Sequence, residues 1–249
     1  MQLASAKKDY LLMNILGLIP ARGGSKSIPR KNIVPLVGRP LLAYTCDASL
    51  ESRKLDRIII STDDDEIATV ARDLGIEVPF IRPQELAQDR TPSLDVAKHA
   101  LQWLLNEDKW QTDILVLLQP TSPLRKAHHI DEAVEKLLES GADTIVSVIE
   151  VPHRFSPYNL MRLDSGKLSN FWCEELSFDP YHRQSIPVLY TRNGPAILAC
   201  KSNVLSDYSS FYGPHIIPYN MTVEESVDID DRFDLQVAEM LLKRIGQSA

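Results

Sequence analysis

Positive charge and glycine are concentrated in one short stretch near the start of the chain. Residues 21–32 read ARGGSKSIPRKN and continue the apolar run ILGLIPA of residues 15–21. Gly23 and Gly24 let backbone N–H groups approach an anion closely, and the stretch adds four cations: Arg22, Lys26, Arg30 and Lys31. This composition suits a polyphosphate better than a solvated basic turn. It follows neither the Walker A pattern GxxxxGKS/T nor the dinucleotide pattern GxGxxG.

A pair of carboxylates lies near the other end of the chain. Asp228 and Asp230 flank Ile229. Alternate side chains of an extended segment point the same way, so both carboxylates can face one divalent cation. Oxygen ligands suit Mg²⁺, which would bridge phosphates. The alternative role is an acidic cap for a helix beginning near Arg232, which Asp231 can also provide.

The elements that position these residues can be predicted from apolar periodicity. Short apolar runs predict strands at 15–21, 57–61, 77–81, 113–119, 144–150, 196–200 and 216–219. Helices are expected at 40–52, from a cap within 62–64 through Leu74, and at 94–105, 127–140 and 232–245. Glycines close two of these helices, at Gly75 and Gly141.

The alternation of strands and helices predicts an α/β fold with a doubly wound, mostly parallel sheet. Ligands bind such sheets at the carboxyl ends of the strands. The loops after Ala21, Ser61 and Gln119 are therefore the expected places for a site. We expect one domain over residues 14–249, preceded by an N-terminal tail, residues 1–13.

Residues from about 152 to 187 break the pattern, because aromatic, proline and polar residues mix there without a clear period. A turn at residues 164–167 predicts a hairpin. We interpret this segment as an inserted subdomain that covers the site or forms a subunit interface.

Composition excludes several classes of protein. The chain has 249 residues, 44% of them hydrophobic, and a net charge of −7, which disfavours a nucleic-acid-binding surface. Cys46, Cys173 and Cys200 form no CxxC pair, so neither a disulfide framework nor a zinc site is expected and a reducing, cytoplasmic location fits. No run approaches the ~20 apolar residues of a membrane span. The six histidines show no recognisable ligand spacing.

Four stretches together resemble the CMP-sialic acid synthetase (acylneuraminate cytidylyltransferase) family. They are IPARGGSKSIPRKN at 19–32, RPQELAQD at 82–89, LQPTSPLR at 118–125 and SVDID at 226–230. They occur in the family's order, and the resemblance extends from Ile15 to about Leu242. It implies a nucleotide-diphospho-sugar transferase-like fold.

The resemblance implies transfer of CMP from CTP to the anomeric hydroxyl of an acidic eight- or nine-carbon 2-keto sugar, with release of pyrophosphate. In the first loop, the residues implied to hold the nucleotide are Arg22, Gly23, Gly24, Ser25, Lys31 and Asn32. Arg82 and Ser93 stand where the family reads cytosine. The implied catalytic residues are Arg22, Lys31 and Asp230, and the implied Mg²⁺ ligands are Asp228 and Asp230.

The sugar side is implied by three positions. Gln119 would face the sugar, Arg183 would meet its carboxylate, and Asn193 belongs to an N-G-A element into which Pro195 is inserted here. The family also forms homodimers in which the insertion of one subunit reaches the active site of the other, so a homodimer is expected.

Simpler roles remain open for several of these residues. Ser93 can instead cap the helix ahead of Leu94, Arg82 can form a surface ion pair with Glu85 or Asp89, and Gln119 can cap the following turn. Two rival functions also remain. One is a sugar-1-phosphate nucleotidyltransferase using UTP or GTP, whose typical GxGxRxxPxxK loop is missing here; the other is a non-catalytic CTP-binding protein.

Overall fold

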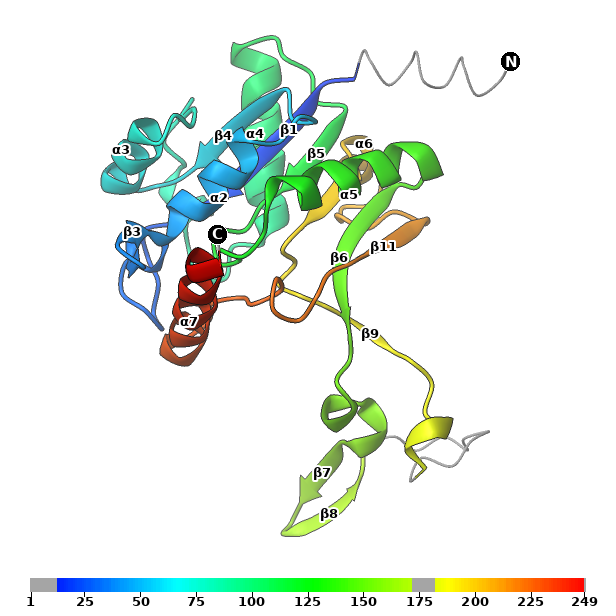
Figure 1. Cartoon of the computed structure of the whole chain (residues 1–249). Helices are drawn as coiled ribbons and strands as arrows, with labels where there is room; N and C mark the ends of the chain where they lie inside the picture. The colour runs from blue at the N-terminus through cyan, green and yellow to red at the C-terminus, as the bar shows by residue number, and fades with distance from the viewer. Residues whose placement is uncertain (1–12, 172–181, 249) are drawn as a thin grey trace.

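The computed structural model of the chain describes residues 13–171 and 182–248, and the side chains of Arg183 and Ser248 are also outside the description. A central sheet has the order β11–β6–β10–β5–β1–β4, with β9 paired to β6 (Figure 1). Its strands are β1 (Ile15–Pro20), β4 (Arg57–Ser61), β5 (Ile114–Leu117), β6 (Thr144–Glu150), β9 (Tyr190–Arg192), β10 (Leu198–Lys201) and β11 (Ile216–Asn220). Only β9 and β10 pair antiparallel to their neighbours in this sheet. The predicted doubly wound, mostly parallel α/β sheet is therefore confirmed.

Helices cover both faces of the sheet because its strands send alternate side chains into two cores. In β1, Ile15 and Ile19 join one core, whereas Leu16 and Leu18 join the other. The first core contains residues of α2 (Leu41–Leu50), α3 (Asp65–Asp73) and α5 (Ala127–Ser140). The second contains residues of α4 (Ser93–Glu107) and α6 (Asn203–Asp207). The last helix, α7 (Arg232–Ser248), packs through Ala238 in a third, smaller cluster.

Capping residues define several of the helix ends that the sequence predicts. Asp64 caps α3 by accepting a hydrogen bond from the Ile67 N–H at 3.0 Å. Gly75 and Gly141 follow α3 and α5 with φ of +83° and +67°, a conformation that favours glycine. Asp231 accepts hydrogen bonds from the N–H groups of Phe233 and Asp234, so it caps α7 as the sequence allowed.

The strand predicted at residues 77–81 is wrong. This segment touches β4 and the residue after it only at two isolated bridges, Ile59 with Glu77 and Thr62 with Ile81. Pro79 lies between the two bridges and has no N–H to donate, so a continuous ladder cannot form there.

The described residues of the segment 152–187, namely 152–171 and 182–187, lie between β6 and β9 and are called the arm here; the rest of the described chain is called the body. Figure 1 shows the arm standing away from the body. It holds the hairpin β7 (Met161–Asp164) and β8 (Lys167–Asn170), turned by Ser165 and Gly166, both at positive φ. Its short helical turns are η3 (His153–Phe155), η4 (Pro157–Asn159) and η5 (Arg183–Ser185). The hairpin predicted at 164–167 is thus present.

The remaining short elements lie before α2 and α4. They are η1 (Lys31–Ile33) and the short pair β2 (Pro35–Leu36) with β3 (Arg39–Pro40), while η2 (Gln84–Leu86) precedes α4. Apart from Met13, the predicted tail over residues 1–13 lies outside the described residues. Among the helices of the described ranges, none is long and apolar enough to cross a bilayer.

Candidate active site

A cavity of about 580 Å³ opens at the carboxyl ends of β1 and β5. This is the edge at which a sheet of this kind binds ligands. Eight of the residues predicted from the sequence line it: Arg22, Ser25, Lys31, Asn32, Arg82, Ser93, Gln119 and Asp230. Segments separated by more than 200 positions thus meet in one pocket.

The basic loop is folded against the acidic segment around Asp230. Lys31 Nζ donates to the carbonyl of Ile229 at 2.7 Å and lies 3.6 Å from a carboxylate oxygen of Asp230. Ser27 Oγ donates to the carbonyl of Asp230 at 2.5 Å. Asn32 Nδ2 donates to the Arg22 carbonyl at 2.9 Å and so fixes the start of the loop. The cations and the carboxylate therefore face the same cavity.

A carboxylate that the sequence analysis gave no catalytic role lies opposite the basic loop. Asp89 contacts Arg22 NH1 at 3.2 Å and also pairs with Lys26. The bond from Lys26 lowers the pKa of the Asp89 carboxyl, which is therefore ionised at neutral pH. Arg22 also donates to the carbonyl of Gln88 at 3.0 Å. These contacts bridge the cavity between the loop at 22–27 and the wall at 86–91.

The structure assigns Gly23 a specific structural role. Its N–H donates to Asp63 Oδ1 at 3.0 Å, and a Cβ there would lie 2.6 Å from Asp64 Oδ2. Gly23 is thus required for close packing against the start of α3. Arg30 pairs with Asp64 and Glu66, so it too serves the contact with α3.

Arg82 is buried beneath the cavity, so the surface ion pair considered from the sequence is wrong. Its Nε donates to Ser61 Oγ at 3.0 Å, and its other nitrogens bond to the carbonyls of Ser61 and Leu86. Burial lowers the pKa of the guanidinium to about 10, which leaves it charged at neutral pH. Ser93 is the first residue of α4 and makes no side-chain capping bond, because Pro92 holds the cap position.

Asp228 and Asp230 differ in their surroundings. Asp230 exposes its side chain to the cavity, whereas Ile229 is fully buried on the opposite side of the segment. Burial raises the pKa of the Asp228 carboxyl. Within the described part of the chain, Asp228 Oδ1 has no hydrogen-bond partner. A buried carboxylate oxygen without a partner, two positions along the chain from a second carboxylate, fits a hard divalent cation such as Mg²⁺, although Asp228 is not among the residues that line the cavity.

The three sugar-side predictions have different outcomes. Gln119 lines the cavity directly after β5. Arg183 begins η5, and its side chain lies outside the described residues. The contact of each with a sugar stays a prediction.

Asn193 is buried, and its amide is used within the protein. Its Oδ1 accepts from Ser147 Oγ at 2.5 Å and from the Ala196 N–H at 3.3 Å. Its Nδ2 donates to Ser226 Oγ at 2.7 Å. Asn193 therefore joins β6 and β10 to the segment that carries Asp228, a structural role that the sequence analysis missed. Direct contact with a sugar stays a prediction.

A histidine pair that the sequence analysis gave no role meets Glu225. His129 Nδ1 accepts from the Lys126 N–H at 3.1 Å, which places the imidazole proton on Nε2, 3.4 Å from Glu225. Burial, assisted by neighbouring His128, lowers the pKa of His129 to about 4. His128, His129 and Glu225 are close enough to surround an ion. However, Nε2 carries the imidazole proton and Nδ1 already accepts from the Lys126 N–H, so the neutral ring offers no lone pair to an ion, and its contact with Glu225 links α5 to the 222–227 loop.

The chain is similar to proteins of known family. A family model described as cytidylyltransferase matches residues 16–234. N-acylneuraminate cytidylyltransferase of Escherichia coli O18:K1:H7 is 36% identical over 225 residues, 90% of this chain and 51% of that protein. The chain thus spans about half the length of that relative. CMP-N,N'-diacetyllegionaminic acid synthase of Legionella pneumophila is 35% identical over 234 residues, 93% of this chain and 97% of that protein.

A solved structure of CMP:2-keto-3-deoxy-manno-octonic acid synthetase complexed with CTP shares the fold. It matches with a TM-score of 0.68 and 15% identity, over 93% of this chain and 99% of that one. The family model spans the basic loop at 22–32, the wall at 82–93 and both carboxylates of the 226–230 segment. The chain belongs to the cytidylyltransferase family.

Proposed function

We propose that this chain transfers CMP from CTP to the anomeric hydroxyl of an acidic 2-keto sugar of the sialic-acid type and releases pyrophosphate. One observation carries the proposal: a single cavity gathers the basic loop at 22–32, the buried Arg82 and the carboxylate of Asp230. The basic loop suits the triphosphate, Arg82 suits the base, and Asp230 suits the reacting phosphorus. The relatives named for N-acylneuraminate and diacetyllegionaminic acid support an acidic sugar as acceptor.

The nucleotide end of the cavity supplies charge and a rigid base contact. Arg22 and Lys31 neutralise the triphosphate, and Ser25 with the backbone of Gly24 completes the cradle. Arg82, held by Ser61 from below, presents a guanidinium edge to the O2 and N3 acceptors of cytosine.

The two carboxylates hold a divalent cation in this proposal. Asp228 and Asp230 would bind Mg²⁺, which neutralises phosphate charge when it is present. The partnerless Oδ1 of Asp228 supports this assignment. Lys31 lies beside Asp230 and would hold this carboxylate close to the phosphates.

The acceptor end of the cavity is the part lined by Gln119. Gln119 offers both a donor and an acceptor to sugar hydroxyls, and a guanidinium such as that of Arg183 can bind a sugar carboxylate bidentately. The anomeric oxygen attacks the α-phosphorus in line, the new O–P bond replaces the bond to pyrophosphate, and the hydroxyl proton passes to a base, for which a water molecule and the two aspartates are the candidates. Positioning and charge neutralisation supply most of the rate enhancement.

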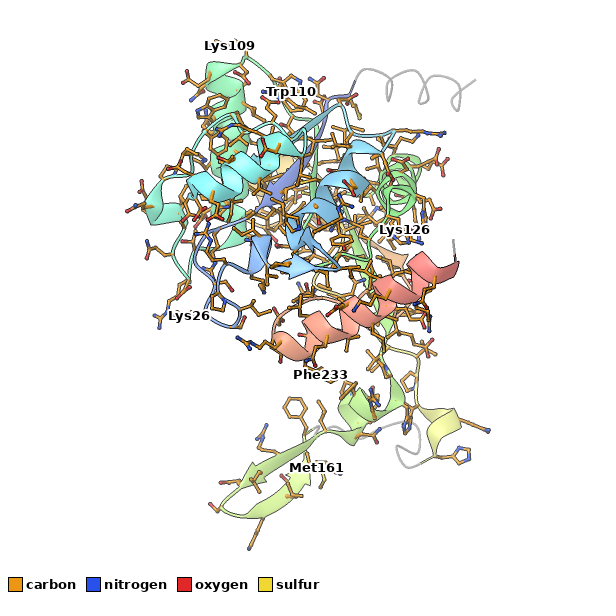
Figure 2. The ribbon with its side chains drawn as sticks, turned by 60° about the vertical axis from the view of Figure 1, so that its left-hand side comes forward. Lys26, Lys109, Trp110, Lys126, Met161 and Phe233 are labelled. Carbon is orange, nitrogen blue, oxygen red and sulfur yellow. The ribbon has the colours of Figure 1, made fainter. Side chains whose placement is uncertain are left out.

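A homodimer belongs to the same proposal. Met161 and Leu163 are two residues apart in β7, so their side chains point to the same face of the hairpin. Leu163 pairs with Leu168 of β8, so the three apolar side chains share that face. All three are exposed, and an isolated two-stranded hairpin is marginally stable in water. Figure 2 shows Met161 far from Lys26, and Lys26 is a residue of the body that lines the cavity. A second copy of the chain would cover this face.

The described cysteines support a reducing, cytoplasmic location. Cys46 and Cys200 are both free and buried. Burial raises the pKa of each thiol to about 12, which keeps it protonated and unreactive.

The test follows phosphorus from CTP into the products. CTP labelled at the α position should give a labelled sugar nucleotide, and CTP labelled at the γ position should give labelled pyrophosphate, both only with the acid present. Release of γ label as inorganic phosphate, or formation of free CMP without the acid, would contradict the proposed transfer.

A further inference from the structure

Arg125 is a buried cation that the proposed mechanism does not use. It ends the loop at residues 118–125 and is 2% exposed. In the described ranges its guanidinium has no carboxylate within ion-pair distance, and its Nε has no hydrogen-bond partner. Burial lowers the pKa of Arg125 to about 9, so it still carries its charge at neutral pH. Burying such a charge is costly, and the fold gains stability if an apolar residue replaces it well.

The contacts of the guanidinium explain why an arginine suits this buried position. Its NH1 donates to the carbonyls of Gln119 at 3.1 Å and Ala196 at 2.6 Å, and its NH2 donates to Thr45 Oγ1 at 2.6 Å. These acceptors belong to the loop after β5, the approach to β10, and α2. The planar guanidinium spreads its donors over separate nitrogens and so spans three separate segments, whereas the three donors of a lysine ammonium all start from one nitrogen atom.

Two of the three tethered segments lead to the acceptor end of the cavity. Gln119 and Thr121 line the cavity, and the Thr121 carbonyl accepts from the Ile229 N–H at 2.8 Å, which ties this loop to the carboxylate segment. Ala196 follows the turn at residues 193–195. In that turn, a Cβ on Gly194 would lie 3.0 Å from Asp228 Oδ2, so the backbone of the turn packs directly against the carboxylate.

We infer that Arg125 is a positioning residue for the acceptor half of the reaction. It fixes the loop carrying Gln119 relative to the turn at 193–195 and so sets where the sugar and the Asp228 segment meet the α-phosphorus. The basic loop and Arg82 lie outside its contacts. This inference rests on the proposed function, and it separates two properties: Arg125 governs use of the sugar, whereas CTP affinity is independent of it.

The test compares Arg125→Lys and Arg125→Met with a matched pair, Arg57→Lys and Arg57→Met. Arg57 is also largely buried, but it bonds to Glu77 and Asp108 at the amino end of β4, away from the cavity. Both Arg125 variants should lose about 10- to 100-fold in kcat/KM for the sugar while the Kd for CTP changes less than about twofold. The Arg57 variants should lower the melting temperature without changing either constant.

Rescue and a milder variant complete the test. The Arg125→Ala variant should regain part of the lost activity when methylguanidinium is added. A variant that is only destabilised would not regain activity in this way. Thr45→Val removes one acceptor and should shift kcat/KM for the sugar in the same direction by less; it also provides the readout if the Arg125 variants do not fold. Wild-type kcat/KM for the sugar in Arg125→Lys or Thr45→Val, or a parallel loss of CTP affinity, would overturn the inference. An inactive wild-type protein would instead contradict the proposed function.

Discussion

In the body, β1 and β5 send alternate side chains into two cores, whereas in the arm every residue of β7 and β8 is exposed. The two regions also differ in polar contacts. In the body the site is tied together across the sequence, for example by Lys31 to Ile229 and by Arg125 to Ala196. A region that buries its own apolar surface can hold a site rigidly, whereas the arm needs a partner surface to do so.

The body and the arm should differ most in how much a single apolar side chain contributes to the free energy of unfolding. Leu115→Ala removes a fully buried side chain from the second core and should cost about 2 to 5 kcal/mol of unfolding free energy. Leu163→Ala removes a side chain that is 69% exposed and should change the stability of the isolated subunit by less than about 0.5 kcal/mol. Urea unfolding at low protein concentration measures both. Equal losses would contradict the contrast between body and arm.

Within the body, Asp230 should be required for catalysis. Asp230→Asn should lower kcat on the order of 100-fold, because it removes a charge at the proposed cation site, while CTP affinity changes little. Asp231→Asn is the matched control, since asparagine caps a helix as well as aspartate and α7 should persist. Unchanged turnover in Asp230→Asn would remove this residue from the cation site.

The body should also carry a specific pH dependence. The folded pKa of His129 is about 4, below the unfolded value of about 6.5, so the unfolded chain binds a proton first as pH falls. Stability should therefore decline between about pH 6.5 and pH 5, by about 1 to 2 kcal/mol more than in His129→Gln. Glutamine offers an acceptor for the Lys126 N–H and does not titrate. Parallel stability curves for the two proteins would refute this role.

The arm should control assembly and leave the fold of the body intact. Leu163→Asp combined with Leu168→Asp places two charges on the proposed dimer face and should convert a dimer into a monomer in sedimentation velocity. The circular dichroism of the body should not change. Lys167→Asp, in the same hairpin, is the control for added negative charge. A wild-type monomer, or a dimer that survives the double change, would contradict the proposed assembly.

The smallest effect concerns Asp89, which holds Arg22 and Lys26 across the cavity. CTP phosphates compete with this carboxylate for the same cations. Asp89→Asn should therefore bind CTP about two- to fivefold more tightly, a modest gain because the ion pairs are exposed to solvent. Isothermal titration at low and high salt measures it, and the gain should shrink with salt. Weaker CTP binding would show that Asp89 serves the nucleotide directly.

The sequence predicted the body better than the arm, for physical reasons. Apolar periodicity located β1, β4 and β5 because both faces of those strands are buried. It failed at residues 77–81, where Pro79 interrupts the ladder, and it could predict little in the arm beyond the turn at 164–167, since exposed strands carry a weak pattern.

Site prediction had a similar limit. Motif spacing identified Arg22, Lys31 and Asp230, which line one cavity. It could not show that Asn193 is turned inward or that Arg125 joins three segments, because those roles arise from contacts between residues far apart in the sequence.

The most direct test of the proposed function measures pyrophosphate release with Mg²⁺ while both substrates are varied. CTP, UTP, ATP and GTP are each combined with a panel of 2-keto acid sugars of eight and nine carbons. We predict release with CTP and one acid, little with the other nucleotides, and none when the acid is omitted. Release with UTP or GTP and a sugar 1-phosphate, or silence across the panel while CTP still binds, would contradict the proposed function.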